Sequence, residues 1–159
     1  MRTETRTKWL IFAFAIAVAL SLAAAPARAD GIDVGVRGGW YSDAEAGFAG
    51  VDLLTSISRS WYFNPNFEYV FVDSGDAYSL NGDVHYDLSA GSAHYFWLGS
   101  GPALIVRDDD RRFGDRKTDV GLDLLAGLGW KGSSAVPYVQ GKVVLADNTE
   151  AVLAFGVRF

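Results

Sequence analysis

The sequence contains no cysteine. This absence excludes a small domain held together by disulfides, a metal site with thiolate ligands and a cysteine nucleophile. Histidine, the side chain most often used for acid–base catalysis near neutral pH, occurs only twice in 159 residues. Basic residues are fewer than acidic ones, 14 against 19. That balance argues against a nucleic-acid-binding protein, because such binding depends on Lys and Arg that neutralise phosphates.

Beyond Asp30 the sequence has no apolar run of about 18 residues, and therefore no transmembrane helix. One apolar run precedes it, from Trp9 to Ala25, between a basic start and the tripeptide Ala27-Arg28-Ala29. These are the parts of a secretory signal peptide. A membrane anchor needs about 20 apolar residues. We therefore expect residues 1–29 to be a cleaved signal peptide. Residues 30–159 then form the mature domain, with a net charge of −8 because the signal peptide carries four basic residues and one acidic residue.

In the mature domain, apolar residues alternate with polar or small ones with a period of two. Such alternation, interrupted at short intervals by Gly, Asp, Asn and Ser, predicts β-strands joined by turns. The segments have 10 to 13 residues, close to the roughly 9–11 of a tilted membrane strand and longer than the five or six usual in soluble sheets. One segment, 94–106, is apolar on both faces, so its register stays open. The predicted strands are 31–41, 46–57, 61–72, 77–88, 94–106, 119–130, 135–145 and 150–159.

The placement of aromatic residues favours a membrane barrel over a soluble sandwich. Alternation fits both, because the apolar face points to the core in a soluble sheet and to lipid in a membrane barrel. Here the aromatic residues gather near strand ends, and Trp and Tyr prefer the membrane–water boundary. We therefore predict two aromatic girdles, one with Trp61, Tyr62, Tyr86, Tyr95, Trp97 and Trp130, the other with Trp40, Tyr41, Phe71 and Tyr78.

Together these patterns predict an all-β fold, an eight-stranded antiparallel up-and-down transmembrane β-barrel. An even number of strands lets such a sheet close without an open edge in lipid. If both termini lie in the periplasm, the longest connection, 107–118, falls on the outer side, as in bacterial barrels of this kind. We therefore expect a bacterial outer-membrane protein with periplasmic termini.

The signal-peptide pattern, the strand segments and the last residues give the sequence a resemblance to the small outer-membrane barrels typified by OmpA and OmpX. The chain ends with apolar residues at alternate positions, Leu153, Phe155, Val157 and Phe159. This ending is similar to the strand signal that the barrel-assembly machinery reads. The resemblance therefore implies that machinery as a partner, together with the lipid and lipopolysaccharide of the outer membrane. Three of the predicted outer loops have only about four residues, so the adhesion and phage reception of relatives with long loops are not implied.

Charged residues on the polar face are expected to pair, because the interior of an eight-stranded barrel is just wide enough for side chains to fill it. Hairpin geometry predicts that Asp123 faces Lys142 and that Arg37 faces Asp52. Closure of the barrel would bring Asp33 to Arg158. Such a network can serve as a plug or as a path for protons or ions, and we favour the plug. The predicted lumen network consists of Asp33, Arg37, Asp52, Glu68, Asp83, His85, Asp87, Asp123, Lys142 and Arg158.

The sequence gives no support for a catalytic site, a cofactor or a metal ion. His85 shares a face with Asp83 and Asp87, but the nearest serine on that face is Ser79. Six residues at about 3.3 Å each put it about 20 Å away, beyond hydrogen-bond reach. The acidic run of the loop 107–118 matches no calcium loop. That run is Asp108, Asp109 and Asp110.

The sequence therefore favours a structural or envelope-interaction barrel. A narrow pore or transporter and a lipid A-modifying enzyme are the alternatives, and the oligomeric state stays open. Basic residues of the loop 107–118 are candidates for contact with lipopolysaccharide phosphates, although mixed charge runs usually form solvated loop tips. These residues are Arg111, Arg112, Arg116 and Lys117.

Overall fold

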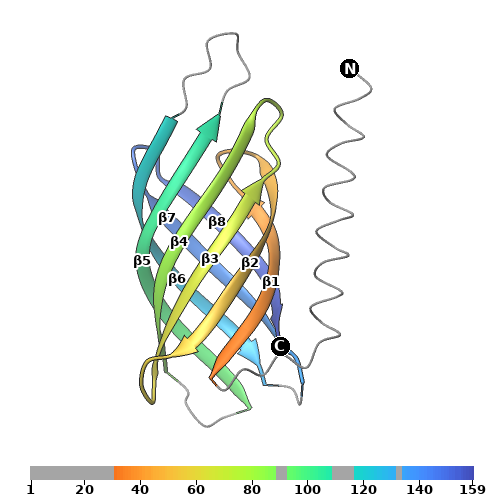
Figure 1. Cartoon of the computed structure of the whole chain (residues 1–159), viewed down its shortest axis with the longest axis vertical. Helices are drawn as coiled ribbons and strands as arrows, with labels where there is room; N and C mark the ends of the chain where they lie inside the picture. The colour runs from red at the N-terminus through yellow and green to blue at the C-terminus, as the bar shows by residue number, and fades with distance from the viewer. Residues whose placement is uncertain (1–30, 89–92, 109–116, 132–133) are drawn as a thin grey trace.

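The computed structural model describes residues 31–88, 93–108, 117–131 and 134–159. These residues form a closed barrel in which each strand pairs antiparallel with the next and β1 pairs with β8 (Figure 1). The predicted eight-stranded antiparallel fold is thereby confirmed. The strands are β1 (Ile32–Tyr41), β2 (Ala46–Ser56), β3 (Trp61–Val70), β4 (Asp76–Asp87), β5 (His94–Asp108), β6 (Lys117–Trp130), β7 (Val136–Leu145) and β8 (Glu150–Arg158).

Every strand boundary lies within two residues of the predicted one. The hairpin of β5 and β6 is longer than expected, because Arg107 pairs with Lys117. Strand pairing thus takes up both ends of the predicted loop 107–118. Its middle, with Asp109, Asp110, Arg111, Arg112 and Arg116, lies outside the described residues, as does the predicted signal peptide. None of the described segments is a helix long and apolar enough to cross a membrane.

β1 begins and β8 ends at the lower end of the barrel in Figure 1. There Val34 and Phe159 exchange backbone hydrogen bonds, with N···O distances of 3.1 and 2.9 Å. The opposite, upper end carries the short connections 42–45, 71–75 and 146–149. "Lower end" and "upper end" are used in this sense below.

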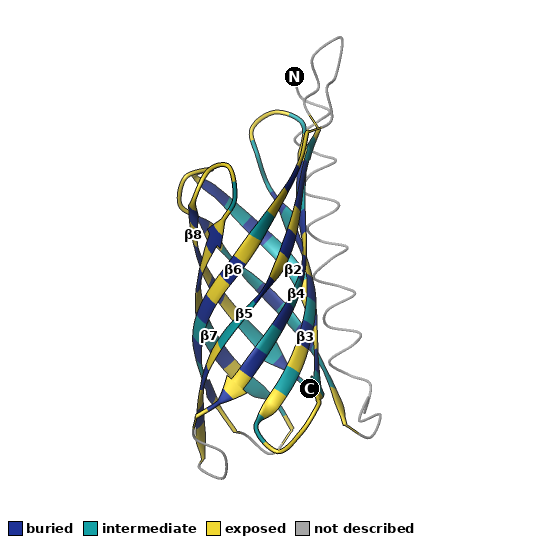
Figure 2. Cartoon of the chain, turned by 90° about the vertical axis from the view of Figure 1, so that its left-hand side faces the viewer, coloured by how far each residue is buried: buried dark blue, intermediate teal, exposed yellow. Residues whose placement is uncertain are grey.

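The outer face of the barrel is apolar and the inner face is polar, the inverse of a soluble sheet. On β6, Leu124 is 47% exposed whereas the neighbouring Asp123 is completely buried. Figure 2 shows the same alternation along the strands. The exposed large apolar residues include Trp40, Val51, Leu53, Phe63, Phe67, Leu80, Phe96, Leu98, Leu104, Val120, Leu122, Val143, Leu145, Leu153 and Phe155.

The structure settles the register of the segment 94–106, which the sequence left open. Odd-numbered residues of β5 point inward, including Trp97, Gly101 and Ala103, while Leu98 and Leu104 are exposed. The small inward residues suit a close approach of β4. A Cβ atom at Gly101 would lie only 2.3 Å from the backbone oxygen of Gly82.

The girdle prediction is wrong for four residues, of which Tyr41, Tyr95 and Trp97 are buried inside the barrel. Tyr62 is half-buried and also points inward, into a pocket at the lower end. A position near a strand end does not reveal whether the side chain points into or out of the barrel. Successive side chains of a strand alternate between the two faces of the sheet, so the face depends on whether the residue number is odd or even. The other predicted girdle residues lie on the outer face, with Trp40, Trp61, Tyr86 and Trp130 exposed and Phe71 and Tyr78 half-buried.

Inward glycines of β6 make room for these rings. A Cβ atom at Gly127 would lie 2.1 Å from Cζ2 of Trp97. We expect Gly127→Ala to lower the free energy of unfolding by about 1–3 kcal/mol, the usual cost of overpacking. The matched control is Gly141→Ala, since nothing lies within 4 Å of a Cβ atom at Gly141. Urea unfolding of both variants in detergent is the measurement, and equal effects would contradict this view of the packing.

Candidate functional site: the filled interior of the barrel

Side chains fill the interior in layers. At the upper end, Tyr41, Phe48, Val70, Ile105 and Val144 belong to a buried apolar cluster. At the lower end, Tyr95, Trp97, Leu125 and Tyr138 form a second one. Between them lie buried polar and charged residues. The other members of the upper cluster are Ala46, Ala77, Ala103, Val152 and Ala154.

Glu68 is the centre of the polar layer near the upper cluster. Its Oε1 lies 3.0 Å from Nη2 of Arg37, and its Oε2 lies 3.2 Å from Nζ of Lys142. All three side chains are completely buried. The hydroxyl of Tyr41 also donates a hydrogen bond to Glu68. One carboxylate therefore compensates two buried cations that come from β1 and β7.

Lys142 also pairs with Asp123, at 3.4 Å between Nζ and Oδ2. The predicted contact is present, but the predicted register is wrong. Lys142 is opposite Leu125, and Asp123 is opposite Val144. The ion pair therefore runs diagonally between β6 and β7, which the long lysine side chain permits.

Asp52 is the centre of a second group, nearer the lower end. It accepts hydrogen bonds from Nε of Arg158 at 2.6 Å, Nδ2 of Asn64 at 3.0 Å and the hydroxyl of Tyr138 at 3.0 Å. The predicted partner, Arg37, is instead opposite Gly50 and pairs with Glu68. The turn 42–45 is centred one residue earlier than the prediction assumed, which moves every pair by two positions.

The predicted pair of Asp33 and Arg158 is also replaced. Arg158 is opposite Gly35 and binds Asp52, while Asp33 is half-buried two residues closer to the lower end. Both residues line the lower pocket, together with His85 and Asp87. All the residues of the predicted lumen network thus point inward, but of the three predicted pairs only Asp123 with Lys142 is formed.

A chain of amide groups joins β3 to β4. Nδ2 of Asn66 donates to Asp83 at 2.9 Å, and Nδ2 of Asn81 donates to Asn66 at 2.8 Å. The hydroxyl of Ser79 donates to Asn81 at 2.8 Å. Ser79 is thus engaged in this chain, whereas His85 stacks on Trp97 with 5.7 Å between ring centroids. The geometry offers no serine–histidine pair on this strand.

Residues that the network prediction did not include complete the interior. Tyr138 could have been recognised, because Gln140 and Lys142 on the same strand have the same parity. At the upper end, Arg107 pairs with Asp119 at 3.2 Å and with Glu150 at 3.4 Å. Within the described part of the chain no group of His, Asp and Glu is arranged to hold a metal ion.

No protein-family model and no curated protein matches the sequence. Among solved structures, the N-terminal β-barrel domain of Pseudomonas aeruginosa OprF is similar, with a TM-score of 0.68 and 15% identity over 82% of this chain and 96% of that one. Neisserial surface protein A gives 0.61 and 16% over 80% and 94%. Ail, the attachment invasion locus protein of Yersinia pestis, in complex with the heparin analogue sucrose octasulfate, gives 0.60 and 14% over 81% and 97%. All three are outer-membrane barrels, and the likeness is one of fold.

Proposed function

We propose that this chain, which has the fold of eight-stranded outer-membrane barrels, is a bacterial outer-membrane protein with a structural or envelope-interaction role and a lumen closed by its own side chains. The observation that carries the proposal is the order in which layers of side chains fill the inside of the barrel. The charges are paired in the middle, and a buried apolar cluster that includes Phe48 and Ile105 lies above them.

The apolar outer face supports the membrane location. Monomeric soluble proteins rarely expose contiguous apolar patches larger than a few hundred Å², yet large apolar side chains are exposed on all eight strands here. Polar side chains meanwhile fill the interior. This arrangement suits lipid outside and hydrogen-bonding partners inside. We further propose that the lower end faces the periplasm, since the short upper connections and the long β5–β6 hairpin then face outward.

The filled interior argues against a pore. An ion that crossed the lumen would have to part buried ion pairs such as Glu68 with Arg37 and then enter the upper apolar cluster. Transfer of an unpaired charge into apolar surroundings is very costly. The upper rim adds the bridge from Arg107 to Glu150, which joins β5 to β8. A catalytic role is not proposed, because the inward histidine lies in an aromatic stack.

The outer face of β8 agrees with a role in assembly. Leu153 and Phe155 are exposed there, and Val157 and Phe159 are half-buried. We propose that these residues are read by the barrel-assembly machinery before the barrel closes. Contact with lipopolysaccharide is proposed for the upper rim, where Lys117 is more than half exposed.

We expect the mature protein to begin near Asp30, to fractionate with the outer membrane and to migrate differently on gels when it is not boiled. In planar bilayers the purified barrel is expected to give no steady conductance. An open porin serves as the positive control, and the gel shift verifies that the inserted protein is folded. Stable single-channel currents from folded protein would show that the barrel is an open pore and would contradict the closed lumen. Solubility without detergent would refute the membrane location.

A further inference from the structure

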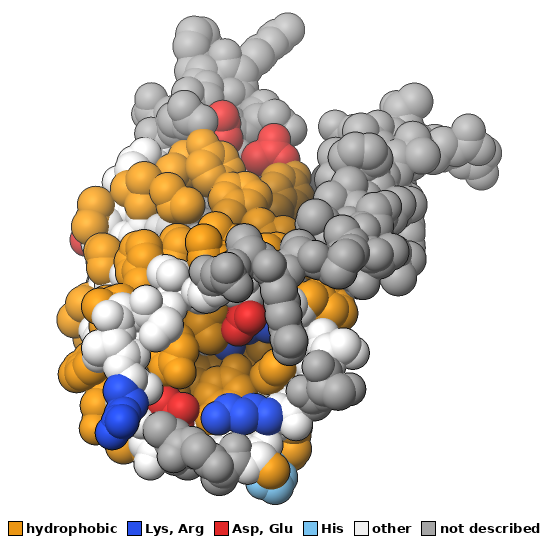
Figure 3. Space-filling view, turned by 60° about the horizontal axis from the view of Figure 1, so that its bottom comes forward, with side chains coloured by type: hydrophobic (Ala, Val, Ile, Leu, Met, Phe, Trp, Pro, Cys, Tyr) orange, Lys and Arg blue, Asp and Glu red, His pale blue; other side chains and the backbone are white. Residues whose placement is uncertain are grey.

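A pocket lies inside the lower end of the barrel. Figure 3 shows this end hollowed, with acidic and basic side chains around the hollow. The volume of the pocket is about 100 Å³. A water molecule occupies about 30 Å³ of liquid, so the pocket has room for a few waters or for one solute of about the size of a small amino acid. The lumen charges described above do not need this space for their pairing.

One wall of the pocket is a rigid aromatic stack. Trp97 stacks with His85, with 5.7 Å between ring centroids, and also with Tyr95, with 4.7 Å between ring centroids. Nε1 of Trp97 donates to Gln140 at 3.3 Å, which fixes the indole. The wall is therefore formed before any ligand arrives, which lowers the entropic cost of binding.

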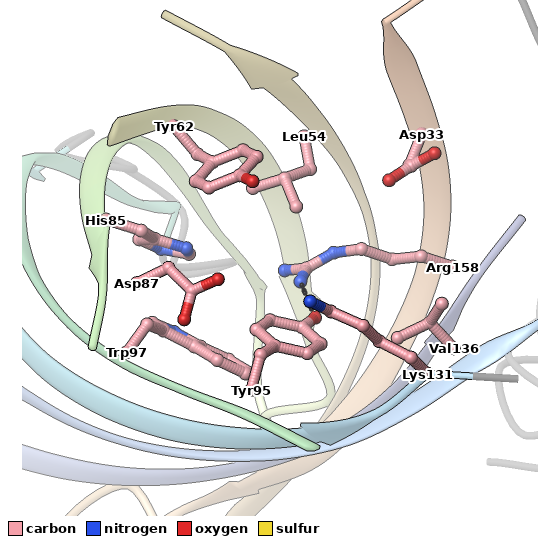
Figure 4. A pocket seen from close by; sticks show the side chains of 10 residues that line it. All are labelled: Asp33, Leu54, Tyr62, His85, Asp87, Tyr95, Trp97, Lys131, Val136 and Arg158. Atoms are coloured by element: carbon pink, nitrogen blue, oxygen red, sulfur yellow. Dashed lines mark hydrogen bonds between the residues drawn. The ribbon is translucent and has the colours of Figure 1, made fainter. Parts of the chain in front are cut away.

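Arg158 projects from β8 into the pocket, facing His85 (Figure 4). Its Nε binds Asp52 at 2.6 Å, and its Nη1 binds the hydroxyl of Tyr95 at 3.0 Å. Its third nitrogen, Nη2, is buried and has no hydrogen-bond partner among the described residues, and the same holds for Nε2 of His85. Both side chains are more than nine-tenths buried. Because buried polar groups are almost always hydrogen-bonded, both nitrogens point to a polar ligand, and Nη2 of Arg158, which can only donate, requires an acceptor group on it.

The charges around the pocket restrict that ligand further. Lys131 and Arg158 supply positive charge, and Asp33 and Asp87 supply negative charge. A simple anion would be repelled by the two carboxylates, and a simple cation by the guanidinium. A molecule that carries a negative and a positive charge a few atoms apart can place the negative charge near Lys131 and Arg158 and the positive charge near Asp33 and Asp87.

We propose that this pocket binds a small zwitterion, of which a short α-amino acid is the simplest example. Its carboxylate accepts hydrogen bonds from Nη2 of Arg158 and from the ammonium of Lys131, and its ammonium faces Asp33 and Asp87. The flat faces of the aromatic wall cover its short apolar part. This function is independent of the closed barrel proposed above, which needs no ligand.

Histidine-selective isotope labelling and NMR of the folded barrel in detergent provide the test. The chain has only two histidines: His85 in the pocket wall, and His94, which is exposed and does not line the pocket. Glycine is expected to shift the imidazole signals of His85 saturably and to leave those of His94 unchanged. Acetate and methylammonium at the same ionic strength carry one half of the zwitterion each and should bind more weakly than glycine. Absence of a saturable shift, or equal binding of the three probes, would overturn the proposal.

Two variants locate the site. Lys131→Ala is expected to weaken glycine binding about two- to fivefold, the range for an exposed charge pair, whereas Lys117→Ala at the upper end should leave it unchanged. Asp33→Asn should weaken the binding of glycine but not that of acetate. Loss of binding in Lys117→Ala, or an equal loss of both probes in Asp33→Asn, would refute this placement. Conductance plays no part in these readouts, so the result stands apart from that of the bilayer experiment.

Discussion

Replacing Glu68 by glutamine is expected to lower the free energy of unfolding of the barrel by about 3–5 kcal/mol. The change keeps the shape of the side chain and removes the charge that compensates Arg37 at 3.0 Å and Lys142 at 3.2 Å. Both cations stay completely buried, and breaking a buried pair by removing one partner has this cost because an uncompensated charge remains. Urea unfolding of the protein in detergent, followed by tryptophan fluorescence, measures the loss.

Two controls separate this effect from a general loss of acidic charge. Glu45→Gln removes the same charge from an exposed turn at the upper end and should change stability by no more than about 0.5 kcal/mol. Arg37→Met in the Glu68→Gln background should recover part of the loss, because Glu68 is the one ion-pair partner of Arg37 among the described residues, whereas Lys142 keeps Asp123 at 3.4 Å. Strict additivity of the two changes, or equal effects of Glu68→Gln and Glu45→Gln, would show that Glu68 does not organise the interior.

The inward charged residues could be predicted, but their pairing could not. In β1 with β2 and in β6 with β7, the predicted register differs from the observed one by two residues. A shift of two keeps every side chain on its face, because the side-chain period of a strand is two. The sequence therefore identified Arg37, Asp52, Asp123 and Lys142 as inward residues while it misplaced their opposite residues. Which residues are opposite each other depends on the residue at which the turn is centred. The amino-acid composition of these turns did not fix that residue.

Of the three predicted contacts, only that of Asp123 with Lys142 survives such a shift. Lys142 still reaches Asp123 diagonally, at 3.4 Å. Arg37 binds Glu68 instead, because both residues are opposite Gly50 on the two sides of β2, and Asp52 binds Arg158 on β8. The position of Glu68 in the middle of the network follows from the curvature of the whole barrel, since it brings β3 close to β7 across the lumen. Pairing rules for neighbouring strands contain no information on contacts of that kind.

The interior aromatic residues were missed for a different reason. Tyr95 and Trp97 stand on the segment whose two faces are both apolar, so alternation could not assign them. The signal was present on the adjacent segment, where Gly127 and Gly129 occupy the inward parity. A Cβ atom at Gly129 would lie 2.3 Å from Tyr95. Paired glycines on one strand therefore indicate large inward side chains on its neighbour.

Replacing Leu124 by arginine is expected to lower the free energy of unfolding in phospholipid vesicles by about 2–4 kcal/mol, the cost of a basic side chain on the lipid face at the bilayer midplane. Leu124 is 47% exposed on the outer face, at the middle of the 14-residue strand β6. Equilibrium urea unfolding with the variant inserted in vesicles is the measurement.

The depth dependence of this cost makes the experiment specific for lipid contact. Val120→Arg places the same charge on the same face of the same strand but near the upper end, where the cost falls to about 0–1 kcal/mol. Leu125 is only 6% exposed and lies beside Gly99 inside the barrel. The cost of Leu125→Arg therefore arises from crowding and should be similar in detergent and in vesicles. If Val120→Arg were as costly as Leu124→Arg in vesicles, the outer face of β6 would not span a bilayer, because a charge on a surface without a lipid midplane has no reason to depend on depth.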